Sequence, residues 1–224
     1  LDVYLLNFEQ YKKKLPVVVR QSINPLQHFL DIKKQKSHKQ LARKLRSRKY
    51  ITQLAEWENF LSSTPSSTPS EADDKLTVKE LSDKKIWKTY KQAIKQGDAI
   101  DRHSPPEALH KLRKTCKKLR YLLEFFHKLY PERSLEKLLK RLKNLQNVLG
   151  DYQDYAVQQD RLQQFSEEME AINTPSKTFL AMGVVVQELE NRKRKARDRF
   201  SLQFGAFKKP GNQDSFRSLF SSRK

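Results

Sequence analysis

The sequence contains a single cysteine, Cys116, among its 224 residues. One cysteine excludes an internal disulfide and a cysteine-rich metal site. It fits a reducing compartment, so we expect a cytoplasmic protein without a metal or another cofactor.

Long apolar runs are also missing. No stretch of 18 consecutive apolar residues occurs, so we expect no membrane-spanning helix and no membrane partner. The first residues, LDVYLLNFEQYKKK, lack the basic-then-apolar order of a signal peptide. The chain begins with Leu1 rather than methionine, from which we expect a fragment of a longer protein.

Glycine is scarce, with five in the chain, and most prolines are grouped around positions 65–69, 105–106 and 175. The windows between them carry apolar residues at helical spacing, which predicts an all-α protein built as an antiparallel helical bundle. The segment SSTPSSTPSEADD has no large apolar residue and predicts a flexible linker over residues 62–75. Residues 208–224 are rich in serine, glycine and asparagine, and we expect a flexible tail there.

Helix boundaries are marked between these segments. In SPPE we expect Ser104 to cap a helix that begins at Pro105. A second helix with leucines from Leu135 to Leu149 is expected to end at Gly150. The last long helix is predicted over residues 177–207.

An ungapped internal correspondence links two parts of the chain at a distance of 150 residues. Phe29, Tyr50, Leu54 and Trp57 stand 150 positions before Phe179, Phe200, Phe204 and Phe207. This register predicts two pseudo-symmetric helical repeats. Residues 1–61 would be the remainder of a truncated first repeat, and residues 76–207 a complete second one.

Acidic residues are few: 46 Lys and Arg against 26 Asp and Glu give a net charge of +20. Such a chain attracts polyanions, including nucleic acid and polyphosphate. The charge is dense in HKLRKTCKKLR, residues 110–120, where six of eleven residues are Lys or Arg and none is acidic.

On a helix, this segment separates into two faces. One face is apolar and should pack in the bundle: Leu112, Cys116, Leu119, Leu123 and Phe126. The other carries a cationic row formed by His110, Arg113, Lys114, Lys117 and Arg120. Like charges three and four residues apart repel each other, and Glu124 is the one acid between residues 108 and 131. A row of like charges whose repulsion is not relieved by interspersed acids favours a polyanion-binding surface. The alternative is an ordinary solvated helix face.

Further residues extend this prediction. His110 should strengthen polyanion binding as the pH falls, because imidazolium carries an additional positive charge. Additional binding candidates come from the next helix and from the N-terminal part of the chain: Lys140, Lys143, Arg43, Arg46 and Lys49. Basic residues 192–197 occupy the repeat-equivalent position, so paired basic segments could line one groove. We expect Gln146, which lies on an apolar stripe, to form a structural hydrogen bond, with Asp151 or Asp154 as possible partners.

Two segments, HKLRKTCKKLRYLLEFF and LKRLKNLQNVLGDYQD, resemble the CHAD domain, a histidine-containing all-helical family. The first matches its His, Leu-Arg, Lys-x-Leu-Arg-Tyr and Glu-x-Phe pattern through residues from His110 to Phe126. The second matches the Leu-Gln-x-x-Leu-Gly-x-x-x-Asp element from Leu145 to Asp154. The resemblance implies a duplicated helical architecture and inorganic polyphosphate binding, in some members beside a CYTH triphosphatase domain and at polyphosphate granules.

Three functions follow as hypotheses. The first is non-catalytic binding of inorganic polyphosphate. The second is general RNA or DNA binding, although Tyr121 is the one aromatic residue on the basic face. The third is a phosphatase, for which the sequence offers no nucleophile-base set, no paired metal-ligating acids and no phosphate-cradling glycine loop. We therefore expect no enzymatic activity, and an accessory role beside a triphosphatase remains an alternative.

Overall fold

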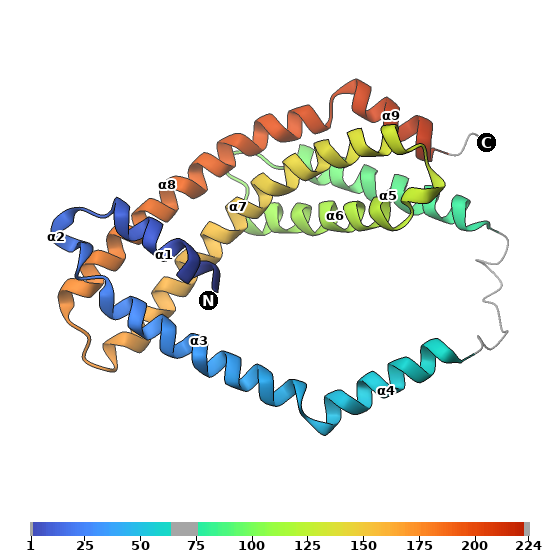
Figure 1. Cartoon of the computed structure of the whole chain (residues 1–224). Coiled ribbons are helices and arrows are strands. Elements are labelled where there is room, and N and C mark those ends of the chain that lie inside the picture. Colours follow the sequence, from blue (N-terminus) through green and yellow to red (C-terminus); the bar gives the residue numbers. More distant parts are fainter. Residues whose placement is uncertain (1, 64–75, 222–224) are drawn as a thin grey trace. The chain divides into compact units, whose positions relative to one another are not determined.

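The structure is a computed structural model that describes residues 2–63 and 76–221. Its elements are helices, which confirms the all-α prediction for the described residues (Figure 1). In chain order they are α1 (Asp2–Lys14), α2 (Val17–Arg20), α3 (Asn24–Leu45), α4 (Arg48–Ser62), α5 (Val78–Asp98), α6 (Pro106–Phe125), the 3-10 helix η1 (His127–Leu129), α7 (Glu132–Glu170), α8 (Ser176–Phe207) and α9 (Pro210–Phe220).

The chain forms two compact units. Unit 1 consists of Leu1–Pro69 and Arg161–Gln187, and unit 2 of Ser70–Asp160 and Glu188–Lys224. The long helices α7 and α8 contribute to both, so the units do not follow the linear division expected from sequence. The two-repeat symmetry and the truncated first repeat stay predictions. The predicted linker lies outside the described residues, apart from Ser62 and Ser63.

In unit 1, α3 packs through aromatic residues. The Phe29 ring meets the Phe165 ring edge to face, with 5.6 Å between centroids. The Lys33 ammonium lies 5.1 Å and 5.3 Å from these two centroids and donates a hydrogen bond of 2.6 Å to Glu168. This lysine therefore covers the aromatic pair while its charge is neutralised.

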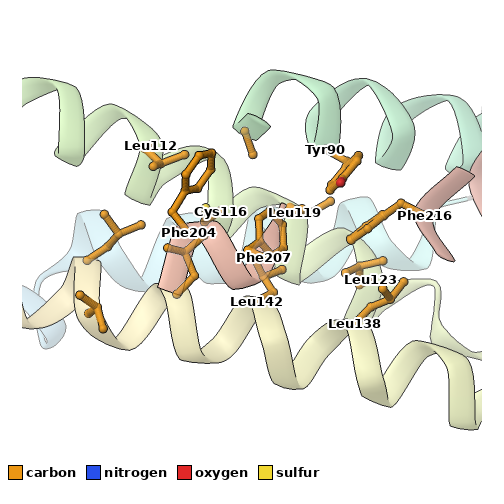
Figure 2. Packing of buried hydrophobic residues seen from close by; sticks show 14 of the residues in the cluster. Tyr90, Leu112, Cys116, Leu119, Leu123, Leu138, Leu142, Phe204, Phe207 and Phe216 are labelled. Carbon is orange, nitrogen blue, oxygen red and sulfur yellow. The ribbon is translucent and has the colours of Figure 1, made fainter. Parts of the chain in front are cut away.

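Unit 2 contains a continuous hydrophobic core formed by α5, α6, α7, α8 and α9 (Figure 2). Helix α5 lies directly against α8 at Gly97, because a Cβ at that position would overlap the Phe204 ring. Further along the core, Tyr90 stacks on Phe216 with 3.9 Å between ring centroids. Aromatic rings of α8 and α9 thus fill the space beside α5 and α6.

Two predicted helix boundaries were wrong. Helix α7 continues through Gly150 to Glu170, because apolar residues on both sides of the glycine are buried. Packing outweighs the ~1 kcal/mol that a glycine costs inside a helix. Helix α6 begins at Pro106 with Pro105 at the N-cap, and the Ser104 hydroxyl donates to the Asp101 carboxylate instead of capping α6.

The predicted flexible tail was also wrong for residues 210–220, which form α9. Pro210 occupies the first turn, where its missing N–H costs no hydrogen bond. Phe216 and Phe220 are one helical turn apart and both are buried, as is Asn212. The polar composition concealed a short helix whose two aromatic residues complete the core of unit 2.

Candidate functional site

The apolar face of α6 packs as predicted. Leu112, Cys116, Leu119 and Leu123 are fully buried, and Phe126 packs against their cluster. Burial raises the pKa of the Cys116 thiol to about 12, so this cysteine is protonated and structural. The packing of the apolar face therefore fixes the orientation of the opposite, cationic face of α6.

Two polar contacts position α6 further. The Gln146 side chain, which is 8% exposed, donates a 2.6 Å hydrogen bond from Nε2 to the Cys116 carbonyl oxygen. The predicted structural role of Gln146 is thus confirmed, but its partner is a backbone carbonyl and not Asp151 or Asp154. From α8, the Arg197 guanidinium donates to the carbonyl oxygens of Asp101 and Ser104, in the turn before α6.

A pocket of about 690 Å³ opens beside the cationic face of α6 in unit 2. Its wall from α6 carries three members of the cationic row, Arg113, Lys117 and Arg120. The full lining is Arg113, Lys117, Arg120 and Tyr121 from α6, Gln146, Asn147, Gly150, Asp151 and Asp154 from α7, and Arg199 from α8. The pocket therefore has four cationic and two anionic side chains.

The remaining predicted residues lie outside the pocket lining. His110 is one turn before Arg113, and its Nδ1 lies 2.9 Å from Oε1 of Gln153. Lys114, Lys140 and Lys143 are exposed in unit 2. Lys143 and Lys140 continue the lining stripe of α7 at helical spacing toward its N-terminus. Arg43, Arg46 and Lys49 are exposed residues of unit 1, and their participation in the same surface stays a prediction.

The charges in the pocket are only partly neutralised. Arg199 pairs with Asp151 at 3.1 Å, and Arg120 lies 3.4 Å from Glu124. Among the described residues, no carboxylate forms an ion pair with Lys117. The Arg120 guanidinium also lies over the Tyr121 ring, 5.2 Å from its centroid. An excess of positive charge thus remains available to a bound anion.

The Asp154 carboxyl of the pocket has a raised pKa. Desolvation raises its pKa above the usual range, and the charge of Asp151 raises it further. The positive charge of Arg113 opposes this shift but does not cancel it. Asp154 therefore takes up a proton more readily than an ordinary aspartate.

The basic segment of α8 is different from that of α6. Arg192 pairs with Glu188 at 2.9 Å, and Lys193 and Arg194 pair with Glu190 at 2.7 Å and 3.9 Å. Acids one turn away relieve this cluster, as expected of a solvated helix face. Among the described residues, α6 carries the less neutralised of these two rows.

Several pocket residues were missed from sequence. Arg199 belongs to α8, and Asp151 was expected beyond the end of its helix, because that helix was predicted to end at Gly150. Once α7 continues, its i+3 and i+4 spacing places Asn147, Asp151 and Asp154 on one face. Charge alone could not identify Arg199, because its pairing with Asp151 spans 48 residues.

Within the described residues, no three or more His, Cys, Asp or Glu side chains are grouped as a metal site. In the same part of the chain, no helix is long and apolar enough to cross a membrane. Fold and pocket thus define an all-helical protein with a cationic pocket between helices.

Comparison with known families agrees with this class. The family model of the CHAD domain matches residues 1–163, so the chain belongs to the CHAD domain family. Two uncharacterised proteins of Mycobacterium tuberculosis are similar to this chain. They are MT2285 of strain CDC 1551 / Oshkosh and Rv2226 of strain H37Rv. Each is 28% identical over 144 residues, which cover 64% of this chain and 26% of the relative. The chain thus spans about a quarter of the length of these relatives.

Proposed function

We propose that this protein binds inorganic polyphosphate in the pocket on α6 without chemically changing it. The observation that carries the proposal is the row of Arg113, Lys117 and Arg120 on one pocket wall, with Arg199 of α8 in the same lining. Charge-assisted hydrogen bonds from such a row suit an anion with many equivalent oxygens. The CHAD domain is known in polyphosphate-binding proteins, which supports the same ligand.

The pocket offers binding groups more than reactive ones. Its described lining contains no serine, threonine, cysteine or histidine as a nucleophile or base. Asp151 is engaged by Arg199, and Asp154 lies beside the charge of Arg113. The proposal therefore assigns polyphosphate retention to this chain, including at polyphosphate granules, and leaves any cleavage to a partner such as a triphosphatase.

RNA is the second candidate, because the side chain of Tyr121 is half exposed at the pocket and can stack on a base. A competition experiment separates the two ligands. Fluorescent long-chain polyphosphate bound to the full chain is displaced by unlabelled polyphosphate or by single-stranded RNA, at equal phosphate concentrations and at two salt concentrations. We expect polyphosphate to compete at least tenfold better. Equal competition by RNA would favour the nucleic-acid function, and phosphate release with magnesium would contradict a purely binding role.

Replacing Asp154 by asparagine should tighten polyphosphate binding about fivefold at neutral pH, because it removes a negative charge worth ~1 kcal/mol at contact distance in water. The wild type should also bind more tightly as the pH falls through the titration of Asp154, whose pKa is raised, because protonation removes the same charge. Asp154→Asn should lack this part of the pH dependence. Binding is measured by fluorescence anisotropy between pH 4.5 and 7.5.

Asp160→Asn is the matched control, because Asp160 is an exposed residue of α7 outside the pocket lining. It changes the net charge equally and should leave the affinity almost unchanged. If both variants bind alike, the carboxylate of Asp154 does not act locally on the ligand.

A further inference from the structure

The α7 wall of the pocket carries hydrogen-bond acceptors for which a bare polyanion has no use. Asp151 and Asp154 lie on one face of α7, and the amide side chain of Asn147 lies one turn before Asp151. The internal phosphates of polyphosphate carry no proton to donate at neutral pH, and ionised carboxylates repel them. The binding of phosphate by the cationic row therefore does not explain this second wall.

Both carboxylates keep oxygens for a further partner. The Arg199 guanidinium contacts Oδ2 of Asp151 at 3.1 Å, which leaves acceptor capacity on the other oxygen. Asp154 is exposed and forms no ion pair with a lysine or arginine among the described residues. Besides desolvation, the charge of Asp151 raises the pKa of Asp154, so the two carboxylates repel each other. A cation held by both would relieve this repulsion.

Gln146 provides an independent observation on the same wall. Its side chain is 8% exposed and belongs to the pocket lining. Nε2 donates to the Cys116 carbonyl oxygen, but the buried Oε1 has no hydrogen-bond partner in the described part of the chain. A buried acceptor without a donor costs free energy. It therefore favours a ligand that brings a donor, which a metal-bound water does and an ionised phosphate does not.

The pocket also has room beside this wall. A Cβ at Gly150 would meet no side chain or neighbouring element within 4 Å, so the lining is open between Gln146 and Asp154. The volume of about 690 Å³ lies in the range of sites that hold small ligands. The wall therefore combines acceptors with space for an ion and its waters.

Mg²⁺ suits this arrangement among the common cations. It keeps several of its waters and is usually bound by one or two carboxylates together with the phosphates of a ligand. The pocket offers two carboxylates, and in the described residues no group of three His, Cys, Asp or Glu forms a metal site of its own. The protein thus holds too few ligands for a resident ion, and phosphate oxygens would supply the others.

We propose that the pocket binds polyphosphate as its Mg²⁺ complex. The cationic row of α6 holds the phosphates, while Asp151 and Asp154 hold the Mg²⁺ ion directly or through its waters. Oε1 of Gln146 accepts a hydrogen bond from one of these waters. This inference rests on the proposed function and adds the form in which the ligand is recognised.

The test compares the wild type with Asp154→Asn in two buffers of equal ionic strength, one with EDTA and one with millimolar Mg²⁺. Fluorescent long-chain polyphosphate is titrated with the full chain in each. With EDTA, the variant should bind about fivefold more tightly, because a repulsive charge is removed. With Mg²⁺ the order should reverse, and the variant should bind at least fivefold more weakly than the wild type. Asp160→Asn should follow the wild type in both buffers.

The outcomes separate this inference from the proposed function. If Asp154→Asn binds more tightly than the wild type in both buffers, the Mg²⁺ complex is not the recognised form, although polyphosphate binding stands. If the wild type binds polyphosphate in neither buffer, the proposed function fails and the inference with it. Calorimetric titration with Mg²⁺ alone should show no binding at millimolar concentration. Tight binding without polyphosphate would overturn the inference, because the ion would then be resident in the protein.

Discussion

Replacing Arg113, Lys117 and Arg120 together by alanine should weaken polyphosphate binding by at least 100-fold. Each side chain lines the pocket wall of α6, and a hydrogen bond to a charged group is worth about 1.5–3 kcal/mol. The salt dependence of the affinity should also become less steep, because fewer counterions are released when fewer phosphates are contacted. Both effects are measured by anisotropy titrations at several salt concentrations.

The matched control is Lys84→Ala, Lys88→Ala and Lys95→Ala on α5. These lysines are not part of the pocket lining, and their replacement removes the same charge from unit 2. We expect a loss of less than fivefold. Similar losses for the two triple variants would show that polyphosphate responds to net charge and not to the pocket.

Phe216→Ala should lower the free energy of unfolding of unit 2 by about 3–5 kcal/mol, the range for a fully buried phenylalanine. Phe216 is 0% exposed, stacks on Tyr90 and lies 5.7 Å from the Phe220 ring. Its removal leaves a cavity between α5 and α9 that helices cannot easily fill. Urea unfolding followed by Trp87 fluorescence in a Trp57→Phe background measures this unit separately.

Phe125→Ala makes the same chemical change at a residue that is 79% exposed. It should cost less than 1 kcal/mol, since little buried surface is lost. If Phe216→Ala is as mild as Phe125→Ala, α9 does not contribute to the core and the expectation of a flexible tail would be restored.

Local patterns in the sequence predicted α6 well. The positions of Leu112, Cys116, Leu119 and Leu123 follow the helical period, so one face is buried and the charged face is exposed for the same geometric reason. Helix ends were harder, because Gly150 is a common helix terminator but lies within α7. The burial of apolar residues before and after Gly150 depends on tertiary packing, and it outweighs the tendency of glycine to end a helix.

Composition was a poor guide to α9. Its serine, glycine and asparagine content favours loops. The helix forms because Phe216 and Phe220 are buried, but these are only two residues of the segment. Their burial depends on the space beside Tyr90 and Tyr130, which sequence does not reveal. Hydrophobic burial at few positions can thus outweigh the preferences of many exposed ones.

By itself, the sequence determined that this protein is all-helical, strongly basic and equipped with a cationic row on α6. These properties follow from composition and from contacts within one helix. Tertiary structure alone decided that Arg199 and Asp151 share the pocket with that row, that Asp154 moderates its charge, and that α9 completes the core. Each of these depends on residues from different helices, whose meeting is set by packing of the whole unit and not by spacing along the chain.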